Sequence, residues 1–117
     1  MDYIKHIVTT HYKLLNSSSQ PERKRMALVG DGIWKGIAAS CVAKKDIEAK
    51  EMGELMTGLI SNKTMAKFFP REYITAYGDL SLNEHSLATF FEAAIYLEYS
   101  KYGFDYMQRK IHAGINF

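Results

Sequence analysis

The spacing of the apolar residues constrains the fold of this chain more than any other feature. Apolar side chains recur every three or four residues, and no segment alternates between apolar and polar residues as a half-buried strand does. In the first segment, residues 2–15, one apolar stripe is formed by Ile4, Ile7, Val8 and Leu15. The sequence therefore predicts an all-α fold.

Capping signals predict where the helices begin and end. Ser19 and Glu22 form an S-x-x-E capping box, and Pro21 stands at the first helical position, so a long helix begins there. A second capping box over residues 81–84 opens another helix, which Gly103 ends. The expected helices span residues 2–15, about 21–43, about 47–60, about 62–69, about 84–101 and about 104–113.

The middle of the chain carries weaker boundary signals. Asp46 is expected to cap the helix that ends near Ile60, and Ser61 or Asn62 is expected to cap a short helix. Residues 70–83, which begin with Pro70, are predicted to be a connection.

Three glycines interrupt the long second helix. In a helix interior, Gly30, Gly32 and Gly36 each cost about 1 kcal/mol relative to alanine. That cost is tolerable where another helix packs closely, so we expect this stretch of the helix to be buried.

Length and composition limit the class of protein. The 117 residues suffice for one domain, and 47% of them are hydrophobic. A net charge of +2 argues against a generic polybasic nucleic-acid binder. Cys41 is the only cysteine and cannot form an intramolecular disulfide, which favours an intracellular location. No apolar run approaches the roughly 20 residues of a membrane span, and the N-terminus lacks a signal-peptide pattern, so no membrane contact is expected.

No single motif specifies a reaction. Cys41 lacks ligands at zinc spacing and is interpreted as a buried thiol. His6 and His11 are five residues apart, which does not place them on one helical face as metal ligands. The basic run Arg23, Lys24 and Arg25 is interpreted first as a solvated helix start and second as a phosphate contact.

Three segments carry a family resemblance in their order along the chain. They are Arg25-Met-Ala-Leu-Val-Gly-Asp31, Leu59-Ile-Ser-Asn-Lys-Thr-Met-Ala66 and Leu87-Ala-Thr-Phe-Phe-Glu-Ala-Ala94. They resemble the helical motifs R-L-E-F-L-G-D, L-V-S-N-x-x-L-A and L-A-D-x-F-E-A-L of the ribonuclease III catalytic domain. The likeness covers about residues 5–110. It implies one ribonuclease III-like helical domain over residues 1–117, with no double-stranded-RNA-binding domain appended.

The resemblance also implies a damaged active site. In the family, E-x-x-x-D on one helix and D-x-x-E on another supply four carboxylates to Mg²⁺, which activates water for phosphodiester hydrolysis. Asp31 and Glu92 match two of these positions, whereas Ala27 and Thr89 stand at the other two. Neither alanine nor a neutral threonine replaces a carboxylate, so no catalytic residue and no metal are expected, and Asp31 and Glu92 are vestigial.

Other glutamates could in principle rebuild the site. Glu51 or, after a shift of three residues, Glu54 falls near a further glutamate of the family. Glu22 and Glu84 lie five residues before the lost positions and off the same helical face.

The leading hypothesis is a non-catalytic domain that acts as a dimerisation module, a double-stranded RNA-binding module or both. The expected partners are a second copy of the chain or a related ribonuclease III-type protein, and the expected ligand is double-stranded RNA. The dimer interface is assigned to Met26, Val29, Gly30 and Ile33, and RNA contact to Arg23, Lys24 and Arg25.

Three alternatives stay open. Ala27, Gly30 and Trp34 could belong to the chain's own core instead of an interface. The protein could be a Mg²⁺-dependent double-stranded RNA endonuclease with a reduced or composite site, in which Asp31 and Glu92 bind the metal. It could also be a protein-binding helical scaffold without RNA affinity.

Overall fold

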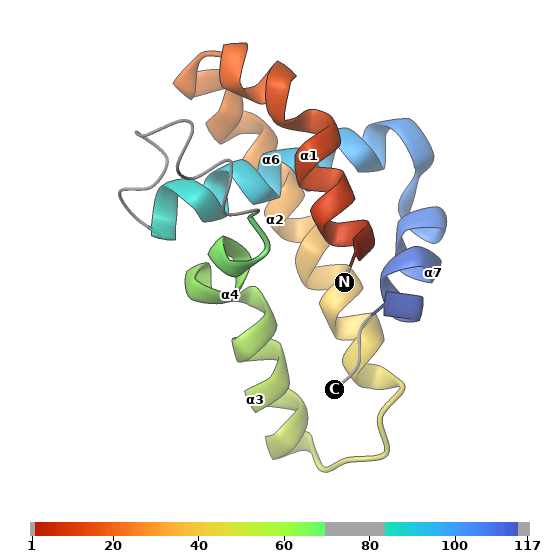
Figure 1. Cartoon of the computed structure of the whole chain (residues 1–117). Coiled ribbons are helices and arrows are strands. Elements are labelled where there is room, and N and C mark those ends of the chain that lie inside the picture. The colour runs from red at the N-terminus through yellow and green to blue at the C-terminus, as the bar shows by residue number, and fades with distance from the viewer. Residues whose placement is uncertain (1, 70–83, 115–117) are drawn as a thin grey trace.

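A computed structural model describes residues 2–69 and 84–114, and every regular element among them is a helix (Figure 1). The helices are α1 (Asp2–Ser17), α2 (Gln20–Ala43), α3 (Ala49–Ile60), α4 (Asn62–Lys67), α6 (Glu84–Tyr102) and α7 (Phe104–Gly114). The all-α prediction is confirmed. The expected connection over residues 70–83 and the capping serine Ser81 lie outside the described residues.

The helix ends follow the capping signals with one exception. The Ser19 hydroxyl accepts a hydrogen bond from the Glu22 amide at 3.3 Å, and α2 begins there as predicted. The Ser61 hydroxyl caps α4 in the same way, and Gly103 separates α6 from α7 with φ +83°. The prediction for α3 was wrong: Glu48 instead of Asp46 occupies the N-cap, without a side-chain cap bond.

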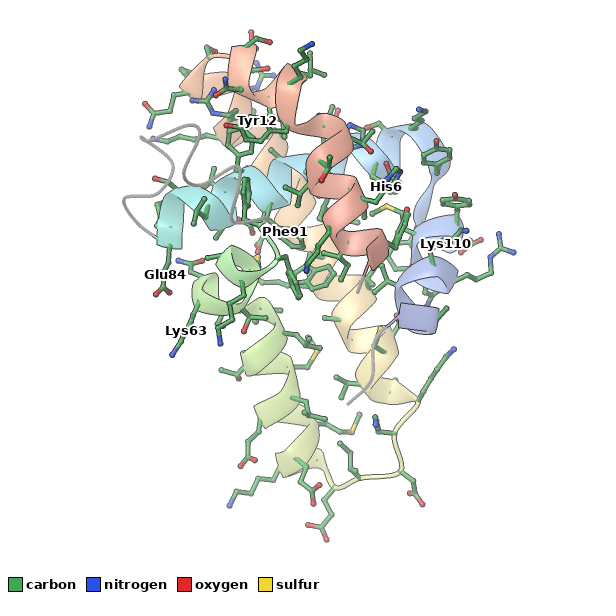
Figure 2. The ribbon with its side chains drawn as sticks, in the orientation of Figure 1. His6, Tyr12, Lys63, Glu84, Phe91 and Lys110 are labelled. Carbon is green, nitrogen blue, oxygen red and sulfur yellow. The ribbon has the colours of Figure 1, made fainter. Side chains whose placement is uncertain are left out.

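Helix α6 forms the centre of the fold and packs against α1, α2, α4 and α7. Its apolar residues cover more than one face, as a central helix requires. Phe91, fully buried, lies in the interior, whereas Lys63, Glu84 and Lys110 lie on the outside (Figure 2). The Trp34 ring of α2 meets Phe91 edge-on, with centroids 5.1 Å apart. The aromatic core therefore joins α2 to α6.

Helices α2 and α6 touch at Gly30. A Cβ atom at this position would overlap the backbone carbonyl of Glu92, so no other residue fits without separating the helices. The expectation that all three glycines are buried was wrong, because Gly32 and Gly36 are exposed. A Cβ at Gly32 would meet nothing within 4 Å, so nothing in the chain's own packing accounts for glycine there.

Helix α2 is long and apolar enough to cross a membrane by length and composition, contrary to the expectation from the sequence. Its buried side is nevertheless packed within the protein. Trp34, Ile37 and Ala38 are fully buried, and α2 makes its main contacts with α6. Less than half of this apolar stretch is buried within the protein, and the rest, including Leu28 and Val29, is exposed.

Candidate functional site

The contact between α2 and α6 brings two carboxyl groups together. Asp31 follows the buried Gly30 on α2, and Glu92 supplies the backbone against which Gly30 packs. The two carboxyl groups lie close enough for each to shift the pKa of the other. A hollow of about 270 Å³ opens beside them and is also lined by Ala27 and Thr89. The four positions that the resemblance aligns with the family's carboxylates therefore line one hollow.

The two carboxyls have opposite protonation tendencies. Burial, followed by the hydrogen bond and the negative charge of Asp31, raises the pKa of Glu92 to about 8. The hydrogen bond from Glu92, assisted by Lys35, holds the pKa of Asp31 below its usual value. Glu92 is therefore the carboxyl of the pair that holds its proton more firmly, and Asp31 is the one that ionises more readily.

Lysine supplies the positive charge beside this pair. The Lys35 ammonium lies 3.0 Å from Asp31 Oδ2, one helical turn further along α2. The Thr89 hydroxyl donates to the His85 carbonyl of its own helix at 3.0 Å, and the residue lines the hollow beside the pair. The residues present do not fit a resident Mg²⁺, which needs several anionic or neutral oxygen ligands and tolerates no ammonium among them.

None of the alternative glutamates joins the pair. Glu51 and Glu54 are exposed on α3, and Glu84 is exposed at the start of α6. Glu22 lines a different hollow. Across residues 2–69 and 84–114, no group of three or more His, Cys, Asp or Glu side chains comes close enough to hold a metal ion.

The basic run does not form one surface. Consecutive helical residues point about 100° apart, so the three side chains diverge. Arg23 donates to the Leu15 and Ser18 carbonyls and so fastens the α1–α2 turn, which makes it a structural residue. Lys24 lines the carboxyl hollow, and Arg25 lines the hollow on the other side of α2. Arg23 and Lys24 also line one hollow at the starts of α2 and α6, so the RNA contact of Arg23, Lys24 and Arg25 stays a prediction.

The residues assigned to a dimer interface differ in their exposure to solvent. Gly30 is buried against α6, which favours the alternative that it serves the chain's own packing. Met26 and Ile33 are half-buried against the core. Val29 is 47% exposed, and its neighbour Leu28, which sequence reasoning did not select, is 77% exposed. The interpretation of Ala27 and Trp34 as core residues agrees with their burial.

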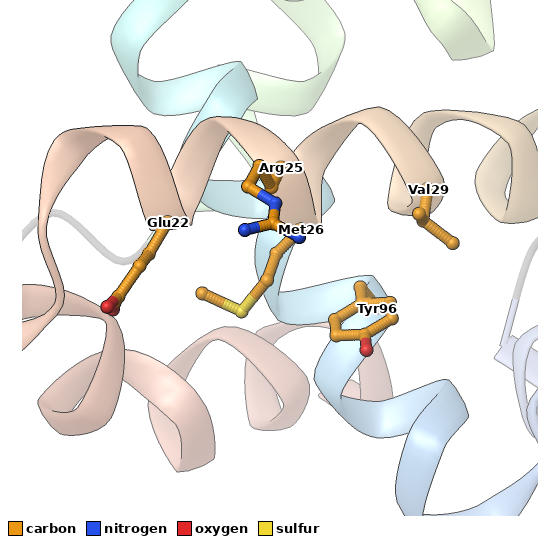
Figure 3. Close-up of a pocket in the computed structure, with 5 residues that line it drawn as sticks. All are labelled: Glu22, Arg25, Met26, Val29 and Tyr96. Carbon is orange, nitrogen blue, oxygen red and sulfur yellow. The ribbon is translucent and has the colours of Figure 1, made fainter.

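A larger hollow of about 420 Å³ lies beside Val29. Four lining residues come from α2 (Glu22, Arg25, Met26 and Val29), and Tyr96 comes from α6 (Figure 3). Met26 and Tyr96 form its apolar part, and Glu22 and Arg25 place opposite charges along its α2 wall.

Sequence reasoning missed a buried polar cluster between α1 and α6. Glu98 is only 3% exposed and accepts hydrogen bonds from the Tyr3 hydroxyl at 2.7 Å and from His11 Nε2 at 2.8 Å. A glutamate among the apolar positions of a central helix was the available signal, but its partners lie 87 and 95 residues away.

Cys41 is buried, and burial raises the pKa of its thiol. Its interpretation as a buried thiol is confirmed.

Comparisons with protein-family models, curated proteins and solved structures found no match in any of the three. The ribonuclease III resemblance therefore stays a proposal that rests on the motifs and on the positions of their residues.

Proposed function

We propose that this chain is a degenerate ribonuclease III-like domain that acts as a non-catalytic dimerisation module. The observation that carries the proposal is the meeting of Asp31, Glu92, Ala27 and Thr89 at one point between α2 and α6. The resemblance requires this arrangement of two motifs that lie about 60 residues apart in the sequence. An unrelated helical fold would have no reason to bring them together.

The chemistry of the carboxyl pair supports the loss of catalysis. The raised pKa of Glu92 and the Lys35 ammonium beside Asp31 both reduce the negative charge that would otherwise attract a divalent cation. We expect no cleavage of double-stranded RNA in Mg²⁺ or in Mn²⁺, which tolerates poorer oxygen sites. Cleavage that disappears in Asp31→Asn or Glu92→Gln would establish the endonuclease alternative.

A gain of metal binding provides the constructive test. We expect calorimetry to find no saturable Mg²⁺ binding to the natural protein at millimolar metal. The double variant Ala27→Glu with Thr89→Asp is expected to bind Mg²⁺, since it returns two carboxylates to the hollow. If this variant folds and stays inert toward metal, the family geometry is absent.

Dimerisation is supported by the outward side of α2. Leu28 and Val29 are exposed there, and Gly32 leaves open space that lets another helix approach closely. The hollow beside Val29 can receive an apolar side chain from a second copy. In a two-fold dimer the same patch meets itself, so Glu22 and Arg25 of one copy would lie near their opposite charges on the other. A second copy of the chain therefore fits this surface.

The oligomeric state tests this surface directly. Light scattering at micromolar concentration is expected to give the mass of a dimer, and Leu28→Glu or Val29→Glu is expected to give a monomer. Leu14→Glu is the matched control, because Leu14 is 57% exposed on α1, away from α2's outward side. A monomeric natural protein, or a dimer that withstands both α2 variants, contradicts the proposal.

A second function, binding of double-stranded RNA, is supported by a hollow at the N-terminal ends of α2 and α6 that Arg23 and Lys24 both line. Its lining includes Lys24, His85 and Thr89, which also line the carboxyl hollow. In an electrophoretic assay, Lys24→Glu is expected to weaken binding of the duplex, whereas Lys63→Glu on α4 is the control. A protein that ignores duplex RNA but dimerises would be a protein-binding scaffold.

A further inference from the structure

Four rings form a continuous aromatic row across α1, α7 and the end of α6. The His6 ring stacks near Tyr3 with centroids 6.5 Å apart, and Tyr3 meets Tyr106 edge-on at 6.3 Å. Tyr106 in turn stacks on Tyr102 at 4.6 Å. His6 is exposed and Tyr102 is 44% exposed, so both ends of the row are open to solvent.

The row is held in place by the buried cluster beneath it. The Tyr3 hydroxyl donates to Glu98, whose other oxygen is bonded to His11. This anchoring fixes the Tyr3 ring, and Tyr3 positions Tyr106. A ligand that stacks on these rings would therefore find them ordered before it binds, which reduces the entropy cost of binding.

Basic side chains border the row. The Lys101 ammonium lies 5.2 Å from the centre of the Tyr102 ring, and the Lys110 ammonium lies 5.6 Å from that of Tyr106. Figure 2 shows Lys110 and His6 on the same side of the molecule. Over residues 99–114 the chain carries three Lys and Arg residues and a single acidic residue, Asp105. Two cations, Lys101 and Lys110, therefore lie directly against rings of the row, whereas the nearby Glu98 is buried beneath it.

We propose that this aromatic row is a binding platform for single-stranded nucleic acid. Unpaired bases stack on the exposed ring of Tyr102, while Lys101 and Lys110 swing from the ring faces to the phosphates. Aromatic rings beside flexible cations are the combination that recognises single strands without regard to sequence. A duplex hides the faces of its bases, and a polyacidic peptide such as polyglutamate has no aromatic ring that could stack on the row. A second copy of the chain would bring like charges together.

The platform is separate from the surfaces of the proposed function. Tyr102 follows Glu92 by ten residues on α6, which corresponds to about 15 Å along the helix axis. Neither the carboxyl hollow nor the hollow beside Val29 is lined by a ring of the row. Single-strand binding can therefore succeed or fail independently of dimerisation and of duplex binding.

Fluorescence anisotropy with labelled oligouridylate and oligothymidylate of about 12 nucleotides tests the platform at low salt. We expect saturable binding, which Tyr102→Ala weakens by about fivefold or more and which Tyr102→Phe leaves within twofold, because the phenyl ring still stacks. Tyr99→Ala is the matched control, since Tyr99 is an exposed tyrosine of the same helix with no ring contact to the row among the described interactions. The double variant Lys101→Gln with Lys110→Gln is expected to reduce the dependence of affinity on salt.

Three results would overturn the proposal. The first is the absence of saturable binding of either single strand by the natural, folded protein. The second is binding that Tyr102→Ala leaves unchanged, or that Tyr99→Ala weakens equally. The third is equal competition by polyglutamate, which would make the surface a site for acidic polypeptides. Circular dichroism of each variant verifies that the fold is retained, and comparison of the two oligonucleotides shows whether the ribose hydroxyl contributes.

Discussion

The substitution Glu92→Gln is expected to stabilise the protein, and to do so only above acidic pH. Glutamine has the shape of a protonated glutamate and can donate the same hydrogen bond to Asp31. The glutamine side chain does not ionise, so it keeps this hydrogen bond at every pH of the experiment. The natural carboxyl, by contrast, holds a proton in the folded state at pH values where the unfolded chain releases it, because its pKa is about 8 instead of 4.5.

The sign and size of the effect follow from this difference. Between pH 4.5 and 8 the folded protein binds more protons than the unfolded chain, so the free energy of unfolding falls as the pH rises. The pKa values differ by 8 minus 4.5, and each unit corresponds to about 1.4 kcal/mol. Multiplying the pKa difference by this energy gives the loss of stability for a fully buried carboxyl. Because Glu92 is only partly buried and solvent screens its charge, we take somewhat less than half of that value, roughly 2 kcal/mol at pH 8.

Urea unfolding at several pH values from 4.5 to 8 measures this difference. Trp34 is the only tryptophan and is fully buried, so its fluorescence reports the loss of the core. The gap between Glu92→Gln and the natural protein should be close to zero at pH 4.5 and should widen toward pH 8. Glu84→Gln, at the exposed start of the same helix, should show no such trend. A gap that does not change with pH, or a variant that is less stable at pH 8, would refute the reasoning.

Three further predictions concern packing and capping. Gly30→Ala should cost several kcal/mol or prevent folding, because its methyl group would overlap the Glu92 carbonyl; thermal unfolding by circular dichroism measures this, and an unchanged melting temperature would contradict the contact. His11→Leu should lower the free energy of unfolding by roughly 3 kcal/mol, since it removes one of the partners of the buried Glu98; a loss below about 0.5 kcal/mol in urea would indicate that water replaces the imidazole. Ser19→Ala should cost about 1 kcal/mol through loss of the α2 cap, and Ser19→Asp should retain most of the stability if capping is the cause.

The sequence by itself determined the helices and their ends. Capping and helical periodicity act over four or five residues, so Ser19 and Gly103 exert their effect whatever the rest of the chain does. The start of α3 was predicted wrongly at Asp46. Its N-cap, Glu48, makes no side-chain hydrogen bond to the helix, so the sequence carries no capping signal there. The pairing of Asp31 with Glu92 was also foreseen, although through the family resemblance and not through local physics.

Tertiary structure alone decided what each side chain does. Arg23, Lys24 and Arg25 are chemically alike and adjacent, yet the packing of α1 and α6 against α2 gives them different roles. The raised pKa of Glu92 and the burial of Glu98 depend on solvent exclusion and on partners from distant segments. Desolvation and hydrogen bonding act through space, and no pattern of neighbouring residues encodes which distant groups will meet.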